Sequence, residues 1–175
     1  LPDGERLQIC LPPSVPAGTV SLTIRKPGQT VSPLTAVTAR YRWDRWNQWQ
    51  KRQETRQRNL TSLLALYDSG DLEGFLQTCV REKLTILLCG ATGSGKTTMS
   101  KTLIGAIDPA ERLITIEDTL ELVIPQPNHV RLLYSKDDIG LSHVTAEALL
   151  QASLRMRPDR VLVQELRDEA AGTYI

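Results

Sequence analysis

An eight-residue segment, Gly90-Ala91-Thr92-Gly93-Ser94-Gly95-Lys96-Thr97, constrains the fold of this chain more than any other feature. It matches the pattern GxxxxGK[ST], the loop that cradles phosphate groups. A short apolar run at 84–89 precedes it, with the length of a buried strand. The run that follows, 97–107, has no proline and one glycine near its end, and predicts a helix. The loop is therefore expected between a strand and a helix, where phosphate binding requires it.

The residue types in this loop explain its chemistry. Glycines let the backbone wrap around an anion, and successive N–H groups at a helix N-terminus face the phosphates. Lys96 is predicted to reach the β and γ phosphates, and the Thr97 hydroxyl to ligate Mg²⁺. A purely structural glycine loop is the weaker alternative. The predicted ligands are ATP and Mg²⁺, and the predicted binding residues are Gly90, Ala91, Thr92, Gly93, Ser94, Gly95, Lys96, Thr97 and Thr98.

Composition limits the remaining possibilities. The 175 residues suffice for one core, or for one domain and part of another, and 41% apolar with 23% charged residues is typical of a globular protein. A net charge of +1 gives no global reason to expect nucleic-acid or membrane binding. Three cysteines without metal-ligand spacing indicate reduced thiols. Because the chain starts at Leu1 and ends inside a predicted helix, we expect a piece of a longer protein, cut at both ends.

The first third of the chain changes character twice. Alternating segments at 7–11 and 20–24 predict a hairpin, so residues 1–36 are expected to be the C-terminal part of a β-rich N-terminal domain. Residues 37–60 form a basic segment that holds all three tryptophans, spaced three residues apart. It is either a contact for a membrane surface or nucleic acid, or an interdomain linker whose tryptophans pack on a neighbouring domain or subunit. We favour the linker.

Residues 61–175 are expected to form the P-loop domain. Asp71 is a predicted N-cap, and Leu149, Leu150 and Leu154 are predicted to share the apolar face of one helix. Alternating helices and apolar strands indicate an α/β fold, a mostly parallel RecA-like sheet with helices on both faces. Helices are predicted at 63–67, 71–82, 97–107 and 146–156, and strands at 84–89, 112–116, 120–124, 129–134 and 161–163.

Three acidic residues follow predicted strands: Glu117, Asp118 and Glu165. In open α/β sheets the ligand lies beyond the carboxyl ends of the strands, where a carboxylate can bind Mg²⁺ or orient an attacking water. Asp118 has the alternative of holding the loop. His129 and His143 have no nucleophile or metal-ligand spacing beside them and are expected to be structural.

Four blocks in register resemble the secretion ATPases of type II and type IV secretion systems: GERLQICLPP…TVSLTIRKP, LLCGATGSGKTT, LITIEDTLEL and LRMRPDRVLVQELRDEAA. The TIRKP and LRMRPDR segments are similar to those of the type IV branch, the hexameric traffic ATPases of conjugation. The resemblance covers nearly the whole chain. It implies a Walker A motif at 90–97, an aspartate box at 116–121 and a Walker B motif at 161–165.

The resemblance also implies roles for single residues. Glu117 becomes the candidate general base, and Glu165 lies near Mg²⁺. Arginines of the N-terminal domain approach the phosphates in this family, and Arg25 is the best match, followed by Arg6 and Arg40. Two departures are Gln164, where glycine is usual, and Gly172, where an aromatic residue is common. The family's histidine box is expected beyond Ile175.

The function implied is an ATP-hydrolysing motor of a type IV secretion or conjugation system, powering pilus assembly or substrate translocation. The resemblance further implies a homo-hexamer in the cytoplasm, bound peripherally to secretion-complex proteins at the bacterial inner membrane, with domain rotation about residues 27–60. Direct sequence-specific binding of nucleic acid is not expected. Two alternatives remain: a type II secretion or pilus motor, and a nucleotide-binding scaffold with little hydrolysis.

Overall fold

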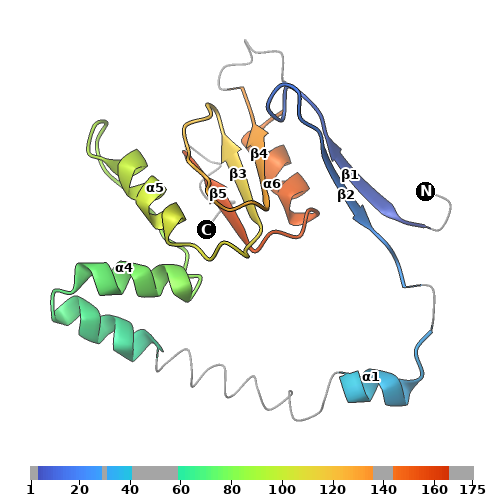
Figure 1. Cartoon of the computed structure of the whole chain (residues 1–175), viewed down its shortest axis with the longest axis horizontal. Helices are drawn as coiled ribbons and strands as arrows, with labels where there is room; N and C mark the ends of the chain where they lie inside the picture. The colour runs from blue at the N-terminus through green and yellow to red at the C-terminus, as the bar shows by residue number, and fades with distance from the viewer. Residues whose placement is uncertain (1–3, 29–30, 41–58, 136–143, 166–175) are drawn as a thin grey trace. The chain divides into compact units, whose positions relative to one another are not determined.

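The computed structural model describes residues 4–28, 31–40, 59–135 and 144–165. The chain packs into two units (Figure 1). One unit combines Leu1–Lys26 with Thr85–Ile175, and the other is Pro27–Leu84. The tryptophan-rich part of the predicted linker and His143 lie outside the described residues. The predicted domain limits, at 36/37 and 60/61, remain predictions.

A three-stranded parallel sheet forms the centre of the first unit. Strand β3 (Leu113–Glu117) pairs with β4 (His129–Leu133) on one side and with β5 (Arg160–Val163) on the other, in the order β4-β3-β5. Every residue of β3 is 0% exposed. β3 is buried along its whole length and β5 is half-buried, and the apolar runs of both strands are why the sequence predicts them. The sheet confirms the predicted α/β class.

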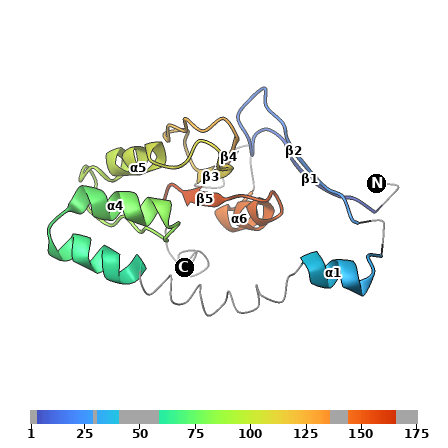
Figure 2. The same ribbon diagram turned by 60° about the horizontal axis from the view of Figure 1, so that its bottom comes forward.

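Helices lie on both sides of this sheet (Figure 2). Helix α6 (Ala146–Leu154) packs against β3 and β4, and α5 (Lys96–Gly105) lies on the other side. The Thr145 hydroxyl caps α6 by accepting from the Ala148 amide at 3.1 Å.

The apolar face of α6 differs from the prediction in one residue. Leu149 is 2% exposed and packs on the sheet, whereas Leu154 is 68% exposed. Five residues advance a helix by about 140°, so Leu149 and Leu154 cannot share a face. Ser153, one turn after Leu149, takes the buried place, and its hydroxyl donates to the Leu150 carbonyl at 2.7 Å.

The predicted N-terminal hairpin is confirmed. Strand β1 (Arg6–Cys10) pairs antiparallel with β2 (Ser21–Arg25). The connection between them reaches the sheet, since Val15 joins the apolar core and the Ser14 carbonyl accepts from the Leu133 amide at 2.9 Å. The hairpin is therefore packed with the P-loop part of the chain in one unit.

The second unit is helical in its described parts. It contains α1 (Leu34–Arg40), a helix at 59–68, and α4 (Leu72–Arg81). Asp71 caps α4 as predicted, accepting from the Gly74 amide at 2.9 Å. Helix α1 was not predicted, since proline commonly breaks regular structure and Pro33 directly precedes the helix. Proline is compatible with a helix start, and here its carbonyl accepts from the amides of Ala36 and Val37.

Two predicted strands are not strands in the structure. Residues 84–89 have no regular secondary structure and are mostly exposed, and they pair with none of β3, β4 and β5. Residues 120–124 form part of the connection from β3 to β4. Within the described parts of the chain, no helix has both the length and the apolar character needed to cross a membrane.

Candidate functional site

The P-loop has the backbone conformation that its glycines permit. Gly93 and Gly95 lie at φ 80° and 89°, in the left-handed region that disfavours L side chains. Gly90 leaves room for a side chain: a Cβ there would lie 2.6 Å from the Ser94 hydroxyl oxygen. Gly93 and Gly95 are therefore needed for the backbone of the loop, and Gly90 accommodates the Ser94 side chain.

The loop leads directly into α5, with Gly95 as the N-cap. Glycine has no side chain that could accept from the first amides of a helix, so these N–H groups are left for a ligand. The Lys96 ammonium donates to the carbonyls of Gly90 and Ala91 at 2.7 and 2.8 Å. Thr97 and Thr98 follow in the exposed first turn. Helix N-terminal amides and a lysine in the same loop are groups that suit a phosphate.

Gln126 connects the far end of α5 to the sheet. This residue is 1% exposed and belongs to the segment that joins β3 to β4. Its side-chain amide donates to the carbonyls of Ile104 and Ile107, at 2.8 and 3.0 Å. The helix that begins in the P-loop is thus held at its C-terminus by a loop of the sheet.

Glu117 ends β3 and is completely buried. Its carboxylate accepts from Arg131 Nε at 2.9 Å and from Arg131 Nη2 at 2.6 Å. The Thr115 hydroxyl donates at 2.6 Å, and the amides of Glu121 and Leu122 donate at 3.2 and 3.1 Å. Both carboxylate oxygens are therefore fully engaged within the protein.

The other acidic candidates lie at the same edge of the sheet. The Gln164 amide donates to the Ile116 carbonyl at 3.1 Å, which continues the pairing of β3 with β5. Glu165 comes next and is half-buried. Asp118, directly after Glu117, is also half-buried. The Gln164 side-chain oxygen is buried and has no partner in the described part of the chain.

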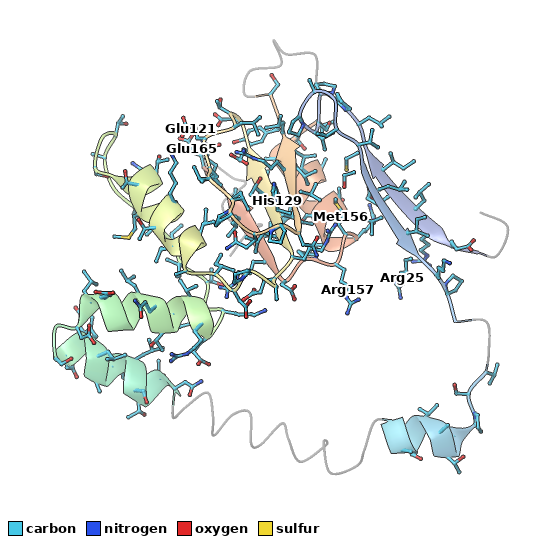
Figure 3. The ribbon with its side chains drawn as sticks, viewed as in Figure 1. Arg25, Glu121, His129, Met156, Arg157 and Glu165 are labelled. Carbon is cyan, nitrogen blue, oxygen red and sulfur yellow. The ribbon has the colours of Figure 1, made fainter. Side chains whose placement is uncertain are left out.

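The predicted arginines belong to the hairpin and to α1. Arg6 and Arg25 are exposed and directly opposite each other across the hairpin. Arg25 lies apart from Glu165 (Figure 3). Arg40 ends α1 in the other unit. His129 is structural, as expected, since its Nδ1 is 2.7 Å from the Gln126 carbonyl oxygen.

Sequence reasoning missed Arg131, Thr115 and Gln126. A signal for Arg131 was available, because an arginine inside a buried apolar strand requires a counter-charge. Gln126 stands between Pro125 and Pro127. Two prolines predict a loop, and they say nothing about the contacts of the side chain between them. Nothing in the local pattern identifies its helix-end partners.

The comparisons with known proteins agree on one family. Residues 51–173 match the family model described as "Type II/IV secretion system protein". The chain is 68% identical over 178 residues to Protein VirB11 of Agrobacterium fabrum, which covers all of this chain and 51% of that protein. It is 46% identical over 183 residues to the type IV secretion system protein VirB11 of Bartonella quintana, again covering 51% of the relative.

A solved structure supports the fold. The crystal structure of the VirB11 ATPase from the Brucella suis type IV secretion system, in complex with sulphate, matches with a TM-score of 0.81 and 40% identity. The match covers 99% of this chain and 49% of that one. The chain thus spans about half the length of the curated relatives it matches. These matches confirm the resemblance drawn from the four sequence blocks, and the chain belongs to the type II/IV secretion system protein family.

Proposed function

We propose that this chain binds Mg–ATP at residues 90–98 and contributes ATP hydrolysis to the motor of a type IV secretion or conjugation system. The observation that carries the proposal is the glycine-shaped loop at the N-terminus of α5, with Lys96 folded over it. Relatives named as type IV secretion proteins support the choice of machine. The Brucella neighbour is named an ATPase and was solved with sulphate, a tetrahedral anion that resembles phosphate in shape and charge.

The proposed roles follow from charge and position. The P-loop amides and Lys96 bind the phosphates, and Thr97 and Glu165 hold the metal. Bound Mg²⁺ would neutralise the charge that develops on the β and γ phosphates. Glu117 and Asp118 are the further acids of this edge, and Glu117 is the proposed partner of the attacking water. Arg25, with Arg6 and Arg40, is proposed to stabilise phosphate charge. Like charges directly opposite each other are unfavourable in a hairpin, which supports an anionic partner for Arg6 and Arg25.

Assembly belongs to the same proposal. The working unit would be a homo-hexamer at the cytoplasmic face of the inner membrane, bound to secretion-complex proteins and moving by domain rotation about residues 27–60. One observation favours the alternative of a nucleotide-binding scaffold: Gln164 places a polar side chain next to Glu165, where the family usually has glycine.

The test compares two lysines of one helix. Lys96→Ala should lower ATP turnover about a hundredfold, because a charge that stabilises the transition state is lost. Lys101→Ala, at an exposed position of the same helix, should leave both nucleotide binding and turnover unchanged. Binding is measured with a fluorescent ATP analogue and turnover by phosphate release. Equal turnover by wild type and Lys96→Ala would refute the site, and binding without phosphate release would favour the scaffold.

A further inference from the structure

The carboxylate at the end of β3 is held by five donors. One Glu117 oxygen accepts from the Thr115 hydroxyl and Arg131 Nε, and the other from Arg131 Nη2 and the amides of Glu121 and Leu122. Two oxygens offer about four lone-pair sites. All are used, and the carboxylate is 0% exposed. For Glu117 to take a proton from water, one of these donors must first leave.

The sheet itself brings these groups together. Thr115 and Arg131 are register partners on neighbouring strands, and Glu117 lies two residues after Thr115. Side chains two residues apart in a strand share a face, so all three stand on the same side of the sheet. The planar fork of the guanidinium matches the two carboxylate oxygens, which a single ammonium could not do.

The network fixes a loop as well as a side chain. The amides of Glu121 and Leu122 belong to the connection that leaves β3 at Asp118. Their common acceptor is Glu117, and Arg131 is the cation that neutralises this buried charge. Without the cation, the carboxylate would be a buried and uncompensated charge, which a protein avoids by opening to water.

We propose that Arg131 is a positioning residue of the nucleotide site. By holding Glu117, it fixes residues 118–122 at the carboxyl edge of the sheet, beside Gln164 and Glu165. The inference rests on the proposed function for its catalytic consequence. Its structural part, the control of the loop by Arg131, stands without bound nucleotide.

The same sheet offers a matched control. Arg160 donates to Glu111 through Nε at 2.8 Å and Nη2 at 3.0 Å, in the same forked geometry. This pair lies at the start of β5, at the opposite end of the strands, and both side chains are 12% exposed. The pair at Glu117 has 21% exposure for Arg131 and none for Glu117. Arg160→Met therefore breaks a comparable ion pair far from the proposed site.

The first experiment measures hydrogen exchange of the Glu121 and Leu122 amides in the nucleotide-free chain. Arg131→Met should speed their exchange at least tenfold, whereas Arg160→Met should change it less than threefold. Arg131→Lys, which keeps the charge but not the fork, should give an intermediate rate. The double variant E117Q/R131M removes both charges and is included in case the single variant fails to fold. It too should exchange at least tenfold faster, since a carboxamide accepts amide hydrogen bonds more weakly. Equal exchange in Arg131→Met and Arg160→Met would overturn the proposal.

The second experiment measures ATP turnover. Arg131→Met should lower kcat at least tenfold while the KM for ATP stays within threefold, and Arg131→Lys should recover part of the loss. Arg160→Met should keep the wild-type kcat. A kcat that is unchanged or raised in Arg131→Met would overturn the catalytic part of the proposal. If the wild-type chain itself shows no turnover that depends on Lys96, the proposed function fails, and the exchange experiment still decides whether Arg131 controls the loop.

Discussion

The side-chain amide of Gln126 lies 2.8 Å from the carbonyl oxygen of Ile104, and this contact joins the β3–β4 connection to the end of the helix that starts in the P-loop. The last carbonyls of a helix have no partner within the helix. Gln126 supplies a donor for Ile107, just after the helix, and a second donor for Ile104, whose carbonyl also accepts from the Ile107 amide at 3.1 Å. The site proposed at the start of α5 is thus supported at the other end of the same helix.

Replacing Gln126 by leucine should lower the free energy of unfolding by about 1 to 3 kcal/mol, because the Ile107 carbonyl loses its side-chain donor and the Ile104 carbonyl keeps only the Ile107 amide. The loss is partly offset, since the Gln126 side-chain oxygen has no partner in the described residues and disappears with it. Urea unfolding is the measurement. Gln77→Leu is the control, because Gln77 makes an exposed contact with Glu73 in α4 that is worth about 0.2 to 0.5 kcal/mol. Equal destabilisation by both changes would contradict the supporting role of Gln126.

Gly90→Ala should weaken nucleotide binding about tenfold, because the new Cβ would lie 2.6 Å from the Ser94 hydroxyl, so that either this hydroxyl rotates away or the loop shifts. Gly105→Ala is the matched control. Its Cβ meets nothing within 4 Å, and alanine in a helix is about 0.5 to 1 kcal/mol better than glycine. Affinity for an ATP analogue is measured for both. The double variant G90A/S94G should recover the affinity, and a failure to recover would show that the Ser94 contact is not the cause.

The three cysteines should react with iodoacetamide at different rates. Burial raises the pKa of the Cys10 thiol, and a weaker hydrogen bond from Gln8 opposes that rise. Burial likewise raises the pKa of Cys79, against a smaller opposing backbone hydrogen bond. A raised pKa leaves less reactive thiolate near neutral pH, so Cys10 and Cys79 should label at least tenfold more slowly than the exposed Cys89.

Mass spectrometry of digested samples measures the three rates. Raising the pH should speed labelling of Cys10 and Cys79, because their thiolate fraction increases towards the raised pKa. In urea the three rates should converge. Equal rates in the folded protein would contradict the burial of Cys10 and Cys79.

Asp71→Ala should destabilise the helical unit by about 1 kcal/mol, because the Gly74 amide loses its side-chain acceptor at the start of α4. Asp71→Asn keeps an acceptor at the same place and should cost less than half as much. Circular dichroism during thermal unfolding measures both variants. Identical losses would mean that the carboxylate acts through its charge near the helix N-terminus and not through the hydrogen bond.

Much of the fold could be predicted because its signals are local. The cap at Asp71 and the apolar runs of β3 and β5 are properties of a few consecutive residues, and the structure confirms them. The apolar run at 84–89 gave the same kind of signal, yet it pairs with none of the described strands of the sheet. A β-strand needs a neighbouring strand to complete its backbone hydrogen bonds, and an apolar run does not identify that neighbour.

The strand predicted at 120–124 is absent for a second physical reason. A strand there would need its amides for a ladder, but Glu117 accepts from the amides of Glu121 and Leu122. Such competition comes from a side chain in another element, so no periodicity within the segment reveals it. The role of Arg131 is hidden from the sequence in the same way, because its contact with Glu117 depends on the register between β3 and β4. The prediction of the P-loop, in contrast, rests on one continuous segment and needs no register with another element.

Because Gly93 and Gly95 have positive φ angles, the loop should accept a D-amino acid at either position better than an L-amino acid. A D-amino acid prefers the mirror image of the backbone angles that an L-amino acid prefers, so D-alanine at either position suits the existing turn. L-alanine at the same position has the same atoms and the wrong chirality. Both variants add one methyl group, but only L-alanine also disfavours the positive φ. Comparing two semisynthetic chains, one with each residue, would therefore separate the effect of the added methyl group from the effect of backbone strain. Ordinary mutagenesis introduces both effects together.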